Sequence, residues 1–252
     1  MTDKLLTRAA LKILFVDTET SLMTVRTFSM FAEITNHDMI IKDWHIICAC
    51  WKWQGDRKVH NASTLEGERE LLVKLREALI NADLVVGHNL DSFDIKKINA
   101  RLIYHELPPI PKLNTFDTLK AIRKVAKISS NRLDYLAKYL GLDGKTKTPS
   151  NLWPMATDGD EKAIRAMVKY CANDVRVLED VYHALLPYFT SHPNLNTLRE
   201  SEVPICPLCE SEHLQPRGFS ITNTGKYQRY QCLTCNKWSR GKKNLNTKVE
   251  LR

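Results

Sequence analysis

The sequence predicts an α/β domain that is followed by a small cysteine-rich module. Short apolar runs typical of buried strands alternate with segments of helical periodicity over most of the chain. Two C-x-x-C pairs then occur between Cys206 and Cys235. With 252 residues, 43% hydrophobic and 26% charged, the chain can form one full domain and an appendage, and collagenous, low-complexity and wholly disordered classes are excluded.

The charge and hydropathy of the chain indicate which kinds of partner it can bind. No apolar run approaches the ~18 residues that a membrane span needs, and Lys12 interrupts the short apolar stretch near the N-terminus, so we expect a cytoplasmic protein with no membrane partner. The net charge is +8, and the last sixteen residues carry six lysines and arginines against Glu250 alone. This basic end predicts a polyanionic partner, although charged tails also serve solubility.

The first half of the chain reads as strands and helices in alternation. A buried strand over 11–16 delivers Asp17 to the edge of a sheet, and a second buried strand at 84–86 precedes Gly87. The remaining predicted elements are β-rich stretches and helices bounded by turn residues: strands at 44–53, 58–62 and 113–116, and helices at 68–82 and 92–104.

The second half is predicted to be mainly helical up to Pro187. A loop runs through Pro149 and Pro154, and a long helix begins near Asp158, with an apolar stripe that includes Cys171 as a small core residue. We therefore expect four parts, which are an α/β domain at 1–190, a linker at 191–202, a four-cysteine module at 203–240 and a basic tail at 241–252.

The end of the first strand carries two carboxylates. Asp17 and Glu19 are two residues apart, so on a strand their side chains point the same way. Two neighbouring carboxylates repel each other unless a divalent cation neutralises them, and oxygen ligands suit a hard cation. The pair is half of a possible metal site, although a polar strand end would look the same.

Three further candidates lie on predicted helices. Asp94 stands at the start of the helix that follows the second buried strand, where an ordinary first-turn acid is also favoured. Tyr170 and Asp174 are four residues apart on the long helix and share one face. Each feature is common by chance, but together they occur in a characteristic order along the chain.

That order resembles the three motifs of the DEDD 3′–5′ exonucleases, in the tyrosine-containing (DEDDy) branch. The segments that carry the resemblance are 15–20 (FVDTET), 86–98 (VGHNLDSFDIKKI) and 170–178 (YCANDVRVL), and residues 133–142 (LDYLAKYLGL) resemble a helix before the third motif. They look most like the exonuclease domains of family B DNA polymerases and free-standing relatives. The resemblance implies an RNase H-like mixed central sheet flanked by helices.

The resemblance also implies roles for individual residues. Asp17, Glu19 and Asp174 would hold one Mg²⁺ or Mn²⁺ ion and Asp17 and Asp94 a second, in a two-metal hydrolysis of phosphodiesters. Tyr170 with Glu19 would orient the attacking water, because an unperturbed tyrosine pKa near ~10 makes a poor base. Substrate contacts would come from Thr18, Asn89, Phe93 and Leu22 or its neighbour Met23, whereas Asp91 and Asp117 match no ligand position and are interpreted as structural.

The implied activity is removal of 5′-mononucleotides from the 3′ end of single-stranded or frayed nucleic acid, with DNA favoured because the motifs look polymerase-like. Three alternatives remain open: an exoribonuclease acting on RNA 3′ ends, a nucleic-acid-binding adaptor with a relic site, and a structure-selective endonuclease. A bacterial or bacteriophage source and a role in replication or repair would suit such an enzyme.

The cysteine-rich module has the pattern C-x2-C-x22-C-x2-C, formed by Cys206, Cys209, Cys232 and Cys235. Four thiolates can close a tetrahedral zinc site, and iron–sulfur ligation is a lesser alternative. The stretch resembles a zinc ribbon with a hairpin turn at 223–225. Lys226, Arg229 and Tyr230 are candidate nucleic-acid contacts in it, while a purely structural role or docking of a replication or repair protein is the competing interpretation.

Overall fold

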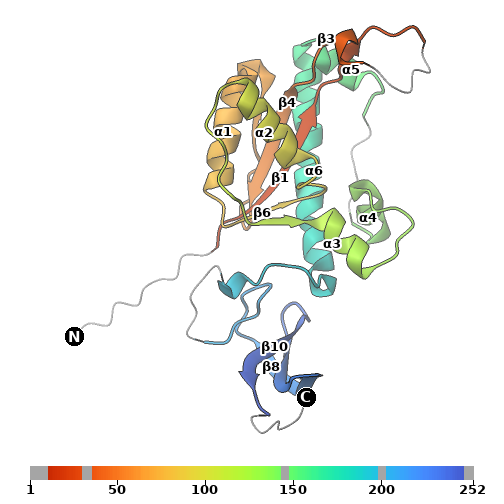
Figure 1. Ribbon diagram of the computed structural model, residues 1–252. Coiled ribbons are helices and arrows are strands. Elements are labelled where there is room, and N and C mark those ends of the chain that lie inside the picture. The colour runs from red at the N-terminus through yellow and green to blue at the C-terminus, as the bar shows by residue number, and fades with distance from the viewer. Residues whose placement is uncertain (1–10, 30–35, 143–147, 198–202, 247–252) are drawn as a thin grey trace. The chain divides into compact units, whose positions relative to one another are not determined.

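The computed structural model describes residues 11–29, 36–142, 148–197 and 203–246, and its chain forms two compact units (Figure 1). The first unit comprises the described residues up to Lys120 together with Ser129–Val181. The second unit comprises Ala121–Ile128 and the chain from Tyr182 onward. The two units therefore divide between Val181 and Tyr182, within the long helix Glu161–Leu185.

A mixed five-stranded sheet forms the centre of the first unit. Its order is β5-β4-β1-β6-β7, with β1 antiparallel to β4 and parallel to β6. The strands are β1 (Ile13–Thr20), β4 (Ile46–Trp53), β5 (His60–Ser63), β6 (Leu84–Gly87) and β7 (Thr115–Asp117). The central strand β1 is buried along its apolar run and continues through Asp17 and Glu19 to Thr20, so both carboxylates lie on the strand.

Helices cover both faces of this sheet. The side chains of Leu14 and Val16 pack with leucines of α1 (Glu68–Ile80) and with Ile98 of α2 (Asp94–Tyr104) in one core. Cys50 and Asp17 are register partners and so face the opposite side, where Cys50 contacts α6 (Glu161–Leu185) through the carbonyl of Val168. The alternation of side chains along β1 thus assigns even-numbered residues to α1 and α2 and odd-numbered residues to α6.

The remaining elements of the first unit are short. They are β2 (Thr24–Val25) paired with β3 (Ile40–Lys42), the 3₁₀ turns His37–Met39 and Thr64–Glu66, and helices α4 (Leu133–Tyr139) and α5 (Leu152–Thr157). Helix α3 (Thr118–Val125) begins in the first unit, and from Ala121 onward it belongs to the second. The sequence predicted a loop through Pro154, and this prediction is wrong because Pro154 lies in helix α5. Pro154 is the third residue of that helix, where the N–H that proline lacks would have had no intrahelical acceptor.

A three-stranded antiparallel sheet of order β10-β9-β8 lies in the second unit. Its strands are β8 (Leu214–Thr222), β9 (Gly225–Cys232) and β10 (Trp238–Asn244), and 3₁₀ turns occur at Leu186–Tyr188 and Leu195–Thr197. Strand β10 crosses the boundary at residue 240 where a basic tail was predicted to begin, so part of that tail belongs to the sheet.

The described part of the predicted linker is folded onto the cysteine module. The Leu195 N–H donates to the carbonyl of Pro207 at 2.9 Å, and the Asn196 side chain donates to the carbonyl of Ile205 at 2.9 Å. His192 forms a 2.7 Å hydrogen bond with the hydroxyl of Tyr182. Burial lowers the pKa of His192 to about 4, so the ring is neutral at physiological pH.

None of the helices in the described ranges is both long enough and apolar enough to cross a membrane.

Candidate active site

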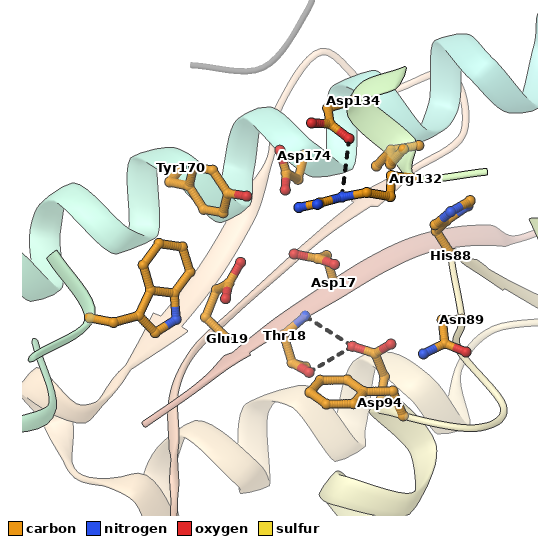
Figure 2. Close-up of a pocket in the computed structure, with 13 residues that line it drawn as sticks. Asp17, Thr18, Glu19, His88, Asn89, Asp94, Arg132, Asp134, Tyr170 and Asp174 are labelled. Carbon is orange, nitrogen blue, oxygen red and sulfur yellow. Dashed lines mark hydrogen bonds and ion pairs between the residues drawn. The ribbon is translucent and has the colours of Figure 1, made fainter. Parts of the chain in front are cut away.

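Strand β1 directs Asp17 and Glu19 to the same side of the sheet. Figure 2 shows both carboxylates pointing toward α6, whereas Thr18 between them points the other way. This geometry follows from the two-residue period of a strand and confirms the prediction that the D-x-E pair converges. The thiol of Cys171 on α6 lies against Asp17, 3.3 Å from its carbonyl oxygen, which fixes the strand and the helix at this point.

Helix α6 supplies Tyr170 and Asp174 on the face turned toward β1 (Figure 2). Both side chains are largely buried, with 8% and 5% of their surface exposed. Trp153 of α5 packs edge-on against the Tyr170 ring, with 5.5 Å between ring centroids. This contact holds the tyrosine ring in place beside the carboxylates.

Three carboxylates meet at one point. An oxygen atom of each of Asp17, Glu19 and Asp174 lies within 4.8 Å of the others. This separation and this set of donors fit a hard divalent cation, which binds carboxylate oxygens and neutralises their repulsion. Asp94 is outside this group of three, although it lines the same cavity.

The charges of the cluster act on one another. Burial raises the pKa of Asp17 well above its usual value, and the negative charges of Glu19, Asp94 and Asp174 raise it further. Without a cation, the folded state therefore binds a proton at Asp17 more tightly than the unfolded chain does. A divalent cation at this position would offset the repulsion among the carboxylates and favour their ionised forms, so the electrostatics agree with the donor set.

Asp94 is held by Thr18. The Thr18 hydroxyl donates to Asp94 Oδ1 at 2.6 Å and the Thr18 N–H donates to the same oxygen at 3.1 Å (Figure 2). Burial raises the pKa of Asp94 to about 6, and these two hydrogen bonds oppose the rise. Thr18 was predicted to contact substrate, whereas its hydroxyl is engaged in fixing this carboxylate at the first residue of α2.

The loop before α2 is shaped by Asp117. Its carboxylate accepts hydrogen bonds from the N–H groups of Asn89 and Asp91 at 3.1 and 3.3 Å and from two N–H groups at the start of α3. Asn89 adopts a left-handed conformation with φ of 72°, which asparagine tolerates better than most residues. The carboxylate of Asp117 thus organises the loop, in agreement with its structural interpretation.

The carboxylates line an open cavity of about 460 Å³. Of the substrate contacts predicted from sequence, Thr18, Asn89 and Phe93 line it. Phe93 is 36% exposed, so it lies at the surface and not in the core. Leu22 is exposed and does not line this cavity, and its N–H donates to the Thr157 hydroxyl of α5 at 3.0 Å.

Five lining residues were not among the sequence-predicted contacts: His88, Arg132, Leu133, Asp134 and Trp153. The His88 ring bridges Thr118 at 2.9 Å and the Asn131 carbonyl at 2.8 Å, and so connects the loop to the segment before α4. The Arg132 side chain, largely exposed, points from that segment toward the carboxylates and lies 3.7 Å from Asp134 (Figure 2). The sequence offered two signals for this group: His88 lies in the segment 86–98 directly after a buried strand, and Leu133 and Asp134 open the segment 133–142.

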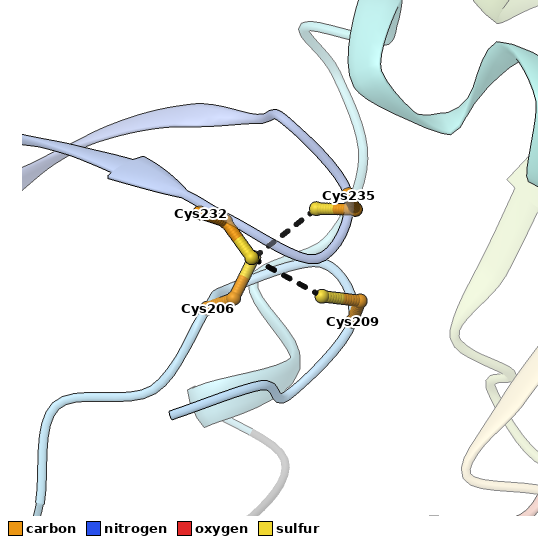
Figure 3. A group of neighbouring side chains, drawn as sticks. All are labelled: Cys206, Cys209, Cys232 and Cys235. Carbon is orange, nitrogen blue, oxygen red and sulfur yellow. Dashed lines mark hydrogen bonds between the residues drawn. The ribbon is translucent and has the colours of Figure 1, made fainter. Parts of the chain in front are cut away.

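In the second unit, the four cysteines of the C-x2-C pairs come together (Figure 3). The sulfur atoms are 3.6 Å apart for Cys206 and Cys235 and again for Cys209 and Cys232. Thiolates bound to one tetrahedral zinc at ~2.3 Å lie roughly 3.8 Å apart, whereas a disulfide requires ~2.05 Å. The spacing therefore fits a metal site and not a disulfide.

The two cysteine pairs form equivalent turns. In each, the N–H four residues after the first cysteine donates to that cysteine's carbonyl, from Glu210 at 3.0 Å and from Asn236 at 2.9 Å. Both residues adopt left-handed φ angles, of 57° and 61°. A hydrogen bond with Cys209 lowers the pKa of Cys206 to about 5, so a thiolate is available at neutral pH.

Comparison with known proteins identifies relatives of the first unit. A family model described as the RNase H superfamily matches residues 41–186, which is more than half of the chain. The structure is similar to the family B DNA polymerase from the hyperthermophilic archaeon Pyrobaculum calidifontis, with a TM-score of 0.53 and 17% sequence identity. That match covers 71% of this chain and 25% of the polymerase, so the chain spans a quarter of the polymerase's length. No curated protein matches the chain.

Proposed function

We propose that this chain, which belongs to the RNase H superfamily, is a divalent-metal-dependent 3′–5′ exonuclease that releases 5′-mononucleotides, preferentially from single-stranded or frayed DNA. The observation that carries the proposal is the convergence of Asp17, Glu19 and Asp174 at one point of an open cavity. Terminal cleavage and the preference for DNA rest on the motif resemblance to polymerase exonuclease domains, and the fold similarity to a family B polymerase supports them.

Asp17, Glu19 and Asp174 would hold one Mg²⁺ or Mn²⁺ ion, and Asp94 with Asp17 would contribute to a second. When bound, such ions supply positive charge that stabilises the attacking and leaving oxygens of a phosphodiester. Thr18 keeps Asp94 oriented toward the cavity through two hydrogen bonds, so that this carboxylate does not turn into the core.

Tyr170 would position the attacking water by hydrogen bonding, together with Glu19. The edge-on contact with Trp153 fixes the tyrosine ring, which reduces the entropy lost when water and substrate are aligned. Trp153 is therefore a positioning residue, because it acts through Tyr170.

Phe93 and Arg132 are the residues best suited to hold the strand end. The exposed Phe93 ring offers a stacking surface for a terminal base, and the exposed Arg132 guanidinium offers N–H donors for a phosphate. Asn89 would supply its amide to the sugar or the backbone.

The four thiolates of the second unit would hold one structural zinc ion. The unit has few buried apolar side chains around the three-stranded sheet, and a module of this size rarely folds on core burial alone. Zinc would therefore supply the folding free energy of the ribbon.

Digestion of 5′-labelled DNA and RNA 20-mers of one sequence tests the proposal. With Mg²⁺ or Mn²⁺ the protein should give a ladder that shortens from the 3′ end, faster on DNA, and Asp17→Asn should abolish it. Asp91→Asn is the matched control, because Asp91 pairs with Lys120 outside the cavity and should leave the ladder unchanged. Intact substrates with the unmodified protein, or equal digestion by Asp17→Asn, would refute the proposal, and faster digestion of RNA would assign the activity to RNA 3′ ends.

A further inference from the structure

One face of the ribbon sheet in the second unit gathers two arginines and two aromatic residues. Arg229 of β9 lies directly opposite Arg240 of β10 in the antiparallel register. Tyr227 is two residues before Arg229 on β9, and Trp238 is two residues before Arg240 on β10. Because side chains two apart on a strand share a face, these four side chains project from the same side of the sheet. We call them the arginine–aromatic face.

Each arginine of this face stacks on an aromatic ring of the neighbouring strand. The Arg229 guanidinium carbon lies 4.6 Å from the Trp238 ring centroid, and the Arg240 guanidinium carbon lies 4.4 Å from the Tyr227 ring centroid. Stacking of this kind fixes the guanidinium plane while its N–H edges stay available as donors. The arginines are exposed, and Trp238 keeps 44% of its surface exposed.

The positive charge of this face is not neutralised within the described ribbon. Like charges directly opposite each other on paired strands destabilise a sheet. Among the residues that the structure describes, no carboxylate forms an ion pair with Arg229 or Arg240. Arg229 instead donates from Nε to the backbone carbonyl of Arg217 at 3.0 Å. Such an arrangement is complementary to a polyanion.

We propose that the arginine–aromatic face binds a single-stranded segment of DNA. Arg229 and Arg240 would contact successive phosphates, and the exposed Trp238 ring and the half-buried Tyr227 ring would stack on unpaired bases. An unpaired strand fits this face because a duplex buries its base faces inside its own stack and offers none for stacking. The proposal goes beyond the nuclease activity, since it concerns a binding surface made only of ribbon residues.

The opposite face of the same sheet carries a different set of side chains. Lys226 lies there with its ammonium 4.0 Å from the Phe219 ring centroid, and Tyr230, four residues further along β9, projects from the same side as Lys226. The three sequence-predicted contacts Lys226, Arg229 and Tyr230 are therefore divided between two faces. Only Arg229 belongs to the arginine–aromatic face, and Lys226 provides a matched control that removes one positive charge from the other side.

The test measures binding of fluorescein-labelled dT20 by anisotropy, using the full chain with Asp94→Asn as an inactive background and a series of salt concentrations. We expect Arg229→Gln and Arg240→Gln each to weaken binding, and the double variant to raise Kd by at least about tenfold. The slope of log Kd against log salt should fall by about 0.7 for each arginine removed, the value expected for single strands. Lys226→Gln should change Kd by less than about threefold, the size expected for a charge outside the contact surface.

A second measurement is independent of whether the arginine variants keep their fold. Zinc content verifies the ribbon in each variant, and quenching of tryptophan fluorescence by dT20 is compared between the background protein and Trp238→Phe. A smaller quench in Trp238→Phe supports the proposal. Equal quenching in the two proteins, unchanged dT20 affinity of the zinc-loaded double variant, or an equal loss with Lys226→Gln would overturn it. Because binding is measured without cleavage, none of these outcomes depends on the proposed nuclease activity.

Discussion

The two units of the chain are stabilised in opposite ways. In the first unit the apolar runs of the central strands are buried between helices, and a cluster of carboxylates lines the cavity at the end of β1. In the second unit most residues of the three strands are exposed or half-buried, and four cysteine sulfurs form its centre. The first unit can therefore tolerate a destabilising site because its core is large, whereas the second depends on its metal ligands.

Removal of zinc should have the largest effect and should be confined to the second unit. Cys209→Ser leaves three thiolates, and structural zinc contributes about 10–16 kcal/mol in small metal-dependent modules. We expect the ribbon to unfold while the first unit keeps its own melting transition, measured by zinc analysis and calorimetry. Cys50→Ala, which changes a cysteine outside the cluster, should retain one zinc ion. Loss of both transitions in Cys209→Ser would show that the units are not independent.

Asp17→Asn should have the next largest effect. It should lower the rate of hydrolysis and raise the melting temperature of the metal-free protein. Hydrolysis should fall at least about a thousandfold, because groups that act as a unit fail together. The raised pKa of Asp17 means that its contribution to stability is present at low pH and is lost as pH rises through that pKa. At neutral pH without divalent metal, the variant should therefore melt at a higher temperature than the unmodified protein.

Addition of Mg²⁺ is a second test of how these carboxylates affect stability, and it compares the unmodified protein with Asp17→Asn. The melting temperature of the unmodified first unit should rise with Mg²⁺, since a ligand that binds only the folded state stabilises it, while that of Asp17→Asn should not. A lower metal-free melting temperature in Asp17→Asn would contradict the view that these carboxylates destabilise the fold.

The interior of the first unit contains a buried ion pair whose loss should cost about 3–5 kcal/mol. The Arg101 guanidinium binds both carboxylate oxygens of Glu68, at 2.8 and 2.6 Å, and each side chain is only 10% exposed. Glu68→Gln leaves Arg101 without its counter-charge and should lower the free energy of unfolding by this amount in urea denaturation. Glu66→Gln, which breaks an exposed pair with Lys74, should cost under about 1 kcal/mol. Similar losses for the two variants would contradict the assigned difference in burial.

Thr18→Val should lower the rate of hydrolysis by about 10- to 100-fold, the range for residues that orient metal ligands. The variant loses the hydroxyl hydrogen bond to Asp94 and keeps the one from the backbone N–H. Because the hydroxyl hydrogen bond lowers the Asp94 pKa, its loss should move the acid limb of the pH–rate profile to higher pH. Thr18→Ser keeps the hydroxyl and should restore both rate and profile. A rate loss without a shift of the acid limb would indicate a purely steric effect.

The smallest expected effect lies in the second unit. The Lys237 ammonium donates to the carbonyls of Pro187 and Phe189 and so connects the second cysteine turn to the segment after α6. Lys237→Met should reduce the stability of the second unit by about 1 kcal/mol, the net value of such hydrogen bonds, without loss of zinc. A change in the melting transition of the first unit would contradict this assignment.

Local sequence patterns predicted the parts of the fold that depend on short-range periodicity. The strand through Asp17, the helix beginning near Asp94 and the long helix with Tyr170 and Asp174 follow from apolar spacing, and the family and structural comparisons confirm the RNase H-like fold. The convergence of Asp17 and Glu19 follows from the two-residue period of a strand. Two C-x-x-C pairs were enough to predict that their cysteines come together.

Features that depend on long-range contacts could not be predicted. Trp153 reaches Tyr170 from a helix that the sequence, with proline in its first turn, did not indicate. The Thr18–Asp94 hydrogen bond joins residues 76 positions apart. Strand β10 contains two lysines, an arginine and a glycine and carries no apolar alternation, so the sequence did not predict that Arg229 and Arg240 lie opposite each other.

The most direct test of the proposed chemistry uses a single-stranded DNA 20-mer that carries one radioactive phosphate, in its 3′-terminal internucleotide linkage. With Mg²⁺ present, the first labelled product should be a nucleoside 5′-monophosphate, released before the rest of the strand shortens appreciably. Label that remains in an oligonucleotide of intermediate length, or that appears as a 3′-phosphate, would contradict hydrolysis at the 3′ end by the carboxylate cavity.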